Sequence, residues 1–267
     1  MEDGIVIEDV SGGDSNTKGS QFVWVPVGKI QTTNGEKEII LGRYSFDSEG
    51  KPSAYSGFYK EETPSEHAET VFVNTVAKDI EDFLYKANLN GGYYIGRYEG
   101  GDGSYGYRYP RTSSTSDNNP IVCKAGVYPY NYITQQQAAT LCRDMYNSSN
   151  FTSDLINSYA WDTAIFFIQE CNKDEDYSVQ NRLQDTIAKC GEATDGTNKD
   201  ERCNIFDMAG NTREWSTETN ANTSPLLPLV CRGGSYYTSD SGVTTSNRTA
   251  TLKGDDAYHS CRPILYL

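Results

Sequence analysis

Apolar residues are concentrated in a few short segments, and long polar stretches separate these segments. Residues 21–28, QFVWVPVG, are almost continuously apolar and rich in valine, which predicts the first strand of the ordered domain. A second strand is predicted at 39–46, and the aromatic segment YYIGRYE predicts another at 93–99. The polar residues 47–67 and the Gly-, Ser- and Tyr-rich residues 100–131 show no periodicity, so we expect both to be loops.

Helical spacing of apolar residues predicts three helices. Residues 69–86 carry an apolar stripe at every third or fourth position, with acidic residues between. Thr134 is followed three residues later by Gln137, a capping box that predicts a helix running through Tyr146. Residues 154–170, DLINSYAWDTAIFFIQE, predict the third helix.

Both ends of the chain differ from its middle. Residues 1–20 end in SGGDSNTKGS, a polar composition that predicts a linker or the remnant of a longer chain. The ordered domain is therefore expected at 21–267. Within it, residues 172–202 are charged and predict no element, whereas from Asn204 on short apolar segments alternate with Gly, Asn, Ser and Thr, which is typical of short strands joined by turns.

The composition excludes several functions. The chain has 23 Lys plus Arg and 37 Asp plus Glu, a formal charge of −14, so we expect no nucleic-acid partner. No segment approaches the roughly 18 apolar residues of a membrane span or shows a signal peptide, so no membrane insertion is expected. His67 and His259 are the only histidines, which excludes a three-histidine metal centre. None of the seven cysteines forms a C-x-x-C pair, which excludes zinc-ribbon and thioredoxin-like sites.

Tyrosine is unusually frequent, with 20 residues against nine Phe and three Trp. Tyr together with Gly, Ser and Asn is typical of adaptable binding surfaces. The high strand propensity of Tyr offers a second explanation. Composition alone does not separate the two.

Four segments carry a pattern that resembles the formylglycine-generating-enzyme-like branch of the C-type-lectin fold. These segments are FVWVPVG at 22–28, YYIGRYE at 93–99, NIFDMAGNTREW at 204–215 and RGGSYY at 232–237. The resemblance implies an α+β domain with a twisted antiparallel sheet, flanking helices and long ordered loops.

The segment NIFDMAGNTREW is the most specific of the four, and its residues suit a scaffold role. Asp207, Gly210 and Asn211 are suited to a tight turn. Met208 and Trp215 are expected to anchor the strands on either side. We also expect Glu214 to pair with Arg232.

The chemistry of the enzymes in this family depends on residues that the chain lacks. In the copper-dependent oxidases of the family, two catalytic cysteines follow the Gly-Gly-Ser motif, and the matching positions here are Thr238 and Val243. The related iron-dependent sulfoxide synthases need three histidines. We therefore expect no enzymatic activity; the alternative is a copper oxidase with altered ligands, using Cys231 and Cys261.

The C-terminus resembles a second branch of the fold, the variable proteins of diversity-generating retroelements. Such proteins end in a strand similar to Gly-Phe-Arg-Pro-Val-Leu-Tyr, and this chain ends in RPILY at 262–266, with Ser260 and Cys261 in place of Gly-Phe. The resemblance implies a non-catalytic ligand-binding protein with its variable region at 232–267, displayed on a phage tail or a bacterial surface. Its partner would be a protein or glycan receptor on a target cell, and homo-oligomers are compatible with the fold. The other alternative is a structural tail domain whose C-terminal region is not diversified.

The segment between Tyr237 and Cys261 has few apolar residues to bury, so we expect its side chains to face solvent on a fixed backbone. An ordinary polar hairpin would have the same composition. The residues expected to form the binding face are Tyr237, Thr238, Ser239, Asp240, Ser241, Val243, Thr245, Tyr258, His259, Ser260 and Cys261.

Three weaker patterns remain. Asp102 and the segment 117–119 offer oxygen ligands for a structural Ca²⁺, although the spacing is not that of a known calcium loop, and no other cofactor is expected. Cys190 and Cys203 are either a disulfide or two buried thiols. The alternating tyrosines of YGYRY at 105–109 predict strand residues on one face, which either extend a binding surface or cover the core, and we favour the core.

Overall fold

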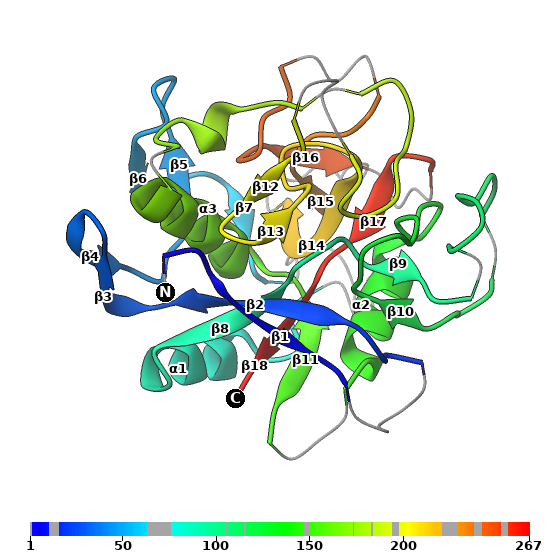
Figure 1. Ribbon diagram of the computed structural model, residues 1–267, viewed down its shortest axis with the longest axis horizontal. Helices are drawn as coiled ribbons and strands as arrows, with labels where there is room; N and C mark the ends of the chain where they lie inside the picture. Colours follow the sequence, from blue (N-terminus) through cyan, green and yellow to red (C-terminus); the bar gives the residue numbers. More distant parts are fainter. Residues whose placement is uncertain are drawn as a thin grey trace.

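The computed structural model describes residues 2–10, 16–62, 76–104, 106–114, 116–146, 150–172, 174–182, 184–193, 198–220, 229–237, 242–251 and 256–267. In these residues, two principal sheets and three α-helices make an α+β fold, as predicted. The first and the last strand of the chain lie in the same sheet (Figure 1).

Five strands form the first sheet, and every neighbouring pair is antiparallel. The predicted strands at 21–28 and 93–99 are both present, although the second begins one residue earlier and ends at Gly96. The C-terminal RPILY segment supplies a fully buried strand next to it. In their order across the sheet, the strands are β1 (Ile5–Glu8), β2 (Gln21–Pro26), β8 (Gly92–Gly96), β18 (Pro263–Tyr266) and β11 (Thr152–Leu155).

The edge strand β1 corrects the prediction that residues 1–20 are a linker. Ile5 lies opposite Trp24, and the register continues to Glu8 opposite Gln21. Val6 packs against the core, while Ile5 is about half exposed. A four-residue edge strand with one inward side chain has too weak a pattern to be recognised beside the polar residues that follow it.

The second sheet has the order β16-β15-β14-β17. Its central strand β14 pairs antiparallel with β15 and parallel with β17, and the far end of β14 also pairs with β7. The chain then passes from β17 directly through Arg262 into β18, which joins the two sheets. The bounds are β16 (Arg248–Thr251), β15 (Leu229–Arg232), β14 (Arg213–Asn220), β17 (His259–Cys261) and β7 (Tyr59–Lys60).

Short hairpins decorate the two sheets, and the β3–β4 hairpin extends at the left of Figure 1. The strand predicted at 39–46 is wrong as a single element, because it ends at Ile39 and resumes at Tyr44. Between them, the Gly42 N–H donates to the Thr163 hydroxyl instead of to a neighbouring strand. The hairpin strands are β3 (Gly28–Thr32) with β4 (Gly35–Ile39), β5 (Tyr44–Phe46) with β6 (Pro52–Ala54), β9 (Gly101–Asp102) with β10 (Ile121–Val122), and β12 (Glu201–Arg202) with β13 (Ile205–Phe206), and a 3₁₀ turn occupies Tyr177–Val179.

Helix α2 (Gln135–Asp144) confirms the predicted capping box. The Thr134 hydroxyl accepts the Gln137 N–H at 3.2 Å, and the Gln137 side chain accepts the Thr134 N–H at 3.1 Å. Apolar residues of this helix face β11, β14 and β17. The cap therefore places the start of α2 beside the end of the second sheet.

The other two helices differ from their predicted bounds. Helix α1 (Ile80–Leu89) begins later than predicted because Asp79 caps its N-terminus, and the predicted start at 69 lies outside the described residues. The segment predicted as a helix at 154–170 is divided between strand β11 and helix α3 (Ser158–Asn172). Asn157 separates the two elements, since its side chain accepts the Ala160 N–H at 2.8 Å.

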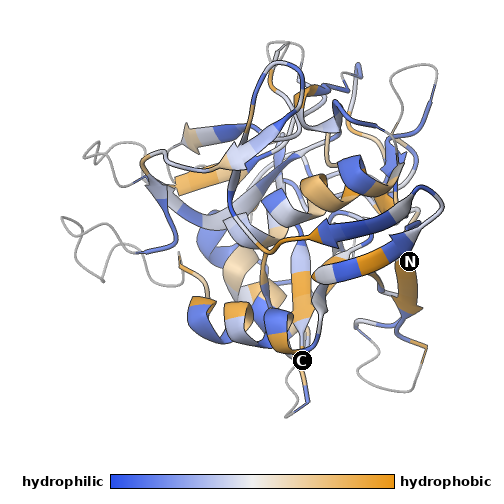
Figure 2. Ribbon diagram, turned by 90° about the vertical axis from the view of Figure 1, so that its left-hand side faces the viewer, coloured by the Kyte–Doolittle hydropathy of each residue, from blue (hydrophilic) through white to orange (hydrophobic). Residues whose placement is uncertain are grey.

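Helix α3 contacts strands of both sheets and forms the centre of the larger core cluster. Its residues Ala160, Trp161, Ala164, Ile165 and Phe167 are all fully buried. A second apolar cluster fills the space between α2 and Trp215. The helices show orange and blue residues side by side in Figure 2, as expected where one side of a helix is buried.

Candidate ligand-binding surface

Three tyrosines of the variable region predicted at 232–267, Tyr236, Tyr237 and Tyr258, form an aromatic cluster. The Tyr237 and Tyr258 rings are stacked, with centroids 4.6 Å apart and planes at 24°. The Tyr236 ring meets Tyr258 edge to face at 6.2 Å. Tyr237 is 43% exposed, and Tyr236 and Tyr258 are half-buried. The cluster therefore presents aromatic surface to solvent from a fixed arrangement.

A buried aromatic pair supports this cluster from below. The His259 ring stacks on Trp215 at 4.7 Å, and Trp215 donates from Nε1 to the Ile133 carbonyl at 2.8 Å. Asp256 Oδ1 lies 2.7 Å from His259 Nδ1. Burial lowers the pKa of His259, but the neighbouring Cys231 and Asp256 outweigh it and raise that pKa to about 9. The His259 ring thus supports the cluster by packing on Trp215, with Asp256 close to its Nδ1.

Tyr132 belongs to the same surface and was not predicted. Its backbone has φ of 54°, a conformation that bulky residues rarely adopt, and its N–H donates to the Asp256 carbonyl at 2.8 Å. Burial, with the Tyr132 and Tyr258 hydroxyls as the next causes, raises the pKa of Tyr236 to about 12. No spacing in the sequence connects residue 132 with 258, so only the fold brings them together.

The structure corrects part of the predicted binding face. Tyr237, Val243 and Tyr258 reach the surface, whereas Thr238, Ser239, Asp240 and Ser241 lie outside the described residues. Four residues expected to face solvent are instead buried: Thr245, His259, Ser260 and Cys261.

The physical reason for this burial is that these residues are part of the scaffold. Residues 259–261 are strand β17, which lies between β14 and helix α2. The Ser260 hydroxyl lies 2.6 Å from the Thr212 hydroxyl. Thr245 donates from its backbone N–H to the Gln180 carbonyl at 2.9 Å. Polar composition suggested exposure, but these polar groups are satisfied internally.

A buried arginine fixes the C-terminal motif. Arg262 is fully buried and pairs with Glu214, with Nε–Oε2 at 2.9 Å and Nη2–Oε1 at 2.5 Å. Its Nη1 and Nη2 also donate to the carbonyls of Gly96 and Phe206, each at 2.8 Å. One side chain thereby connects β17, β14 and β8 at the point where the chain changes sheets.

The predicted pair between Glu214 and Arg232 is wrong. The two residues are backbone partners in β14 and β15, but their side chains have other ionic partners. Arg232 Nη2 lies 2.5 Å from Asp162 Oδ1, and its Nη1 lies 3.3 Å from Glu218 Oε2. Because α3 supplies Asp162 to this side of the sheet, Arg232 joins β15 to a helix and leaves Glu214 to Arg262.

Arg248 and Arg43 extend this second ionic network. Both pair with Glu218, and both lie over the Tyr55 ring, at 4.0 and 4.6 Å from its centroid. Burial would raise the pKa of Glu218, but Arg248, Arg232 and Arg43 outweigh it and lower that pKa. The network fixes β16, so the variable region proposed from the sequence is held at Arg232, Arg248 and Arg262.

Solved structures similar to this chain exist. Treponema denticola variable protein 1 is one of them: it is 12% identical, the match covers 93% of this chain and 96% of that chain, and the TM-score is 0.44. No family model and no curated protein match the chain. In the part of the chain that the structure describes, no helix has the length and apolarity needed to cross a membrane.

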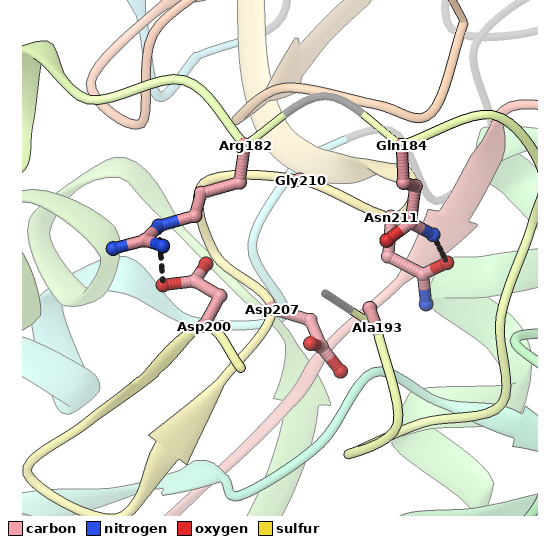
Figure 3. Close-up of a pocket in the computed structure, with 7 residues that line it drawn as sticks. All are labelled: Arg182, Gln184, Ala193, Asp200, Asp207, Gly210 and Asn211. Carbon is pink, nitrogen blue, oxygen red and sulfur yellow. Dashed lines mark hydrogen bonds and ion pairs between the residues drawn. The ribbon is translucent and has the colours of Figure 1, made fainter. Parts of the chain in front are cut away.

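The NIFDMAGNTREW segment forms the predicted tight turn around a small pocket (Figure 3). Asp207 and Asn211 have φ of 64° and 58°, and Met208 and Trp215 are buried on either side. The Arg182 side chain points to Asp200, and the Asp207 carboxyl lies between these groups and Asn211.

Buried carboxyl groups dominate the surroundings of this pocket. Burial, with Asp200 and Glu214 adding to it, raises the pKa of Asp207 to about 8. Asp207 Oδ2 accepts the Gly191 N–H at 2.9 Å, while Oδ1 has no partner among the described residues. Those residues contain no group of three or more His, Cys, Asp or Glu that could hold a metal ion. The arrangement is a structural turn in which burial favours the neutral form of the Asp207 carboxyl group.

Asp102, the main residue of the predicted calcium site, binds a guanidinium group. Arg111 Nε lies 2.7 Å from Asp102 Oδ2, and Asn119 Nδ2 lies 3.3 Å from Oδ1. The structure also corrects the prediction for YGYRY: Tyr107 lies in a turn and Tyr109 directly after it, 43% and 57% exposed, and neither covers the core.

The cysteines are buried free thiols, including Cys190 and Cys203, so the disulfide alternative for that pair is wrong. Cys231 and Cys261 both lie opposite Trp215, on the two strands that flank β14. Their Cα atoms are therefore about 10 Å apart, two strand spacings, with the indole side chain between them. This geometry does not place the two sulfurs on one copper ion.

Proposed function

We propose that this chain is a non-catalytic ligand-binding protein of the C-type-lectin fold, of the formylglycine-generating-enzyme-like type, and a variable protein of a diversity-generating retroelement. Residues 232–267 are the diversified region. The protein is displayed on a phage tail or a bacterial surface, where it binds a protein or glycan receptor of a target cell without a cofactor.

The observation that supports this proposal best is the division of residues 232–267 into two kinds. Arg232 and Arg262 are buried in ionic networks, whereas the stacked rings of Tyr237, which is exposed, and Tyr258, which is half-buried, reach the surface from different parts of the region. A changeable surface on an unchanging frame keeps the backbone preorganised, which reduces the ordering cost of binding. Several copies on one particle would add avidity.

The test is genetic. Downstream of the gene we expect a near-copy of the codons for 232–267, with adenines at the variable codons, and a reverse transcriptase beside it. Among related isolates, substitutions should occur at the exposed positions 237, 243 and 258 and be absent at 232, 248 and 262. Finding neither a near-copy nor this division of substitutions would overturn the proposal.

A further inference from the structure

Three segments of the chain line a small cleft of about 90 Å³ that takes no part in the aromatic surface. Two are loops, within residues 16–18 and 103–107, and the third, 120–124, contains strand β10; residue 105 lies outside the described part of the chain. All the polar side chains that line the cleft can donate hydrogen bonds: Asn16, Lys18, Ser104, Tyr107 and Lys124.

The charge of this cleft contrasts with that of the whole chain. The chain carries −14, yet no carboxylate is among the described residues that line the cleft. Some lysines of the described part lie within ion-pair distance of a carboxylate, for example Lys29 of Glu36 and Lys37 of Glu170, both at 2.8 Å. Lys124 has no such ion pair among the described residues; its Nζ instead lies 3.4 Å from the Lys18 carbonyl.

Two acids near the cleft along the chain are bound to other groups. Asp9 accepts the Thr17 hydroxyl at 2.8 Å and the Tyr146 hydroxyl at 3.2 Å. Asp102 pairs with Arg111 at 2.7 Å. Both carboxylates thus have partners other than the two lysines, and Asp14 lies outside the described residues.

The Lys124 ammonium also has a defined position. It lies 4.9 Å from the centroid of the Tyr107 ring, and a cation over an aromatic face is held by the ring's electron density. The Lys124 stem lies beside Gly19, because a Cβ added to Gly19 would lie 3.4 Å from Lys124 Cδ. A positioned ammonium, a second lysine and neutral donors around a space of this size suit a single oxyanion group.

We propose that this cleft is a binding site for one phosphate or sulfate group. Lys18 and Lys124 supply the charge, and Ser104, Tyr107 and Asn16 supply neutral hydrogen bonds. The group comes either from the free ion or from an ester on a surface polysaccharide, and the chemistry recognised is the same for both. The site is independent of the proposed receptor binding at Tyr237 and Tyr258.

The experiment is a titration of the full chain with inorganic phosphate, sulfate and glucose 6-phosphate, followed by amide NMR shifts. We expect saturable shifts at residues 18, 104 and 124, and weaker binding as ionic strength rises from 0.01 to 0.15 M, where the screening length falls from about 30 to about 8 Å. Equal binding of glucose 6-phosphate identifies an ester as an acceptable source, and binding of the inorganic ions alone identifies the free ion. Shifts that do not saturate, or that occur elsewhere, overturn the proposal.

Matched variants assign the effect to the cleft. Lys124→Gln and Lys18→Gln should each weaken phosphate binding by about tenfold. Lys51→Gln removes an exposed lysine that pairs with Glu49, and it should leave binding unchanged. Lys18 is exposed, so its variant is expected to fold even if Lys124→Gln does not. If Lys51→Gln weakens phosphate binding as much as the cleft variants do, or if the cleft variants do not weaken it, the binding reflects general charge attraction and the proposed site is wrong.

Discussion

The rings of Tyr237 and Tyr258 lie face to face 4.6 Å apart, although most of the polar C-terminal segment lies between the two residues in the sequence. Tyr258 precedes β17, which is fixed by its parallel pairing with β14, while Tyr237 follows the Gly-Gly-Ser turn. In that turn Gly233 has φ of 77°, and an added Cβ would lie 2.6 Å from the Met208 carbonyl oxygen. The stacked pair is thus positioned by strand β17 and the Gly-Gly-Ser turn, and not by the polar residues between the two tyrosines.

The stacked pair should show direct energetic coupling. In a double-mutant cycle of Tyr237→Ala and Tyr258→Ala, we expect a coupling of about 0.5–1.5 kcal/mol in the free energy of unfolding, the range measured for aromatic pairs. Urea denaturation measures it. A control cycle in which Tyr109→Ala, at an exposed tyrosine, replaces Tyr258→Ala should give no coupling with Tyr237→Ala. Equal coupling in both cycles would mean that the ring contact contributes nothing specific.

The Arg262–Glu214 pair should be costly to break from either side. Both side chains are fully buried, so Arg262→Met leaves an unpaired buried carboxylate, and we expect a loss of about 3–5 kcal/mol in chemical denaturation. Glu214→Gln should cost a similar amount because the guanidinium then lacks its counter-charge. The exposed pair Lys29–Glu36 is the control, and Lys29→Met should cost less than about 1 kcal/mol. A small effect at Arg262 would contradict its role as the link between the sheets.

Local patterns predicted the elements whose signals lie within a few consecutive residues. The capping box at Thr134 and the apolar segment at 21–28 are of this kind, and both are present in the structure. The C-terminal strand was expected from the resemblance of RPILY to the ending of variable proteins, and it is present as β18. The strand–helix boundary at Asn157 was missed because apolar residues occur on both sides of the short polar pair Asn157–Ser158, so the apolar spacing continues across it.

The candidate surface was predicted only in part, because exposure depends on contacts between distant residues. Ser260 is polar in sequence yet buried, since Thr212 satisfies its hydroxyl. Tyr132 lies 126 residues before Tyr258 and enters the surface through a backbone bond to the Asp256 carbonyl. The same reason explains the Arg232 error: backbone pairing with Glu214 was compatible with the sequence, but Asp162 arrives from helix α3.

Copper binding separates the proposed binding protein from an oxidase with altered ligands. Because Cys231 and Cys261 flank Trp215 and both are buried, we expect no stoichiometric Cu(I) binding that depends on them. A Cu(I) titration against a chromogenic chelator should give the same result for the wild type and for Cys231→Ser and Cys261→Ser. Tight one-to-one binding that is lost in both variants would refute the non-catalytic proposal.

The carboxyl group of Asp207 should make stability depend on pH. Its pKa in the folded protein is about 8, above the ordinary value of 3.8, because burial disfavours its charge. A group with a raised folded-state pKa contributes stability that is full below the unfolded pKa and is lost as pH rises towards 8. Asp207→Asn removes this titration, and Asn can keep the Gly191 bond and tolerates positive φ. Relative to the wild type, the variant should therefore gain stability between pH 5 and about 8 and level off above it, measured by guanidinium denaturation from pH 5 to 9. Asp207→Ala should follow the same pH trend but be less stable throughout, because it loses the Gly191 hydrogen bond, about 1 kcal/mol, and because Ala disfavours the φ of 64° at this position. A difference from the wild type that does not change with pH in either variant would show that Asp207 is ionised in the folded protein.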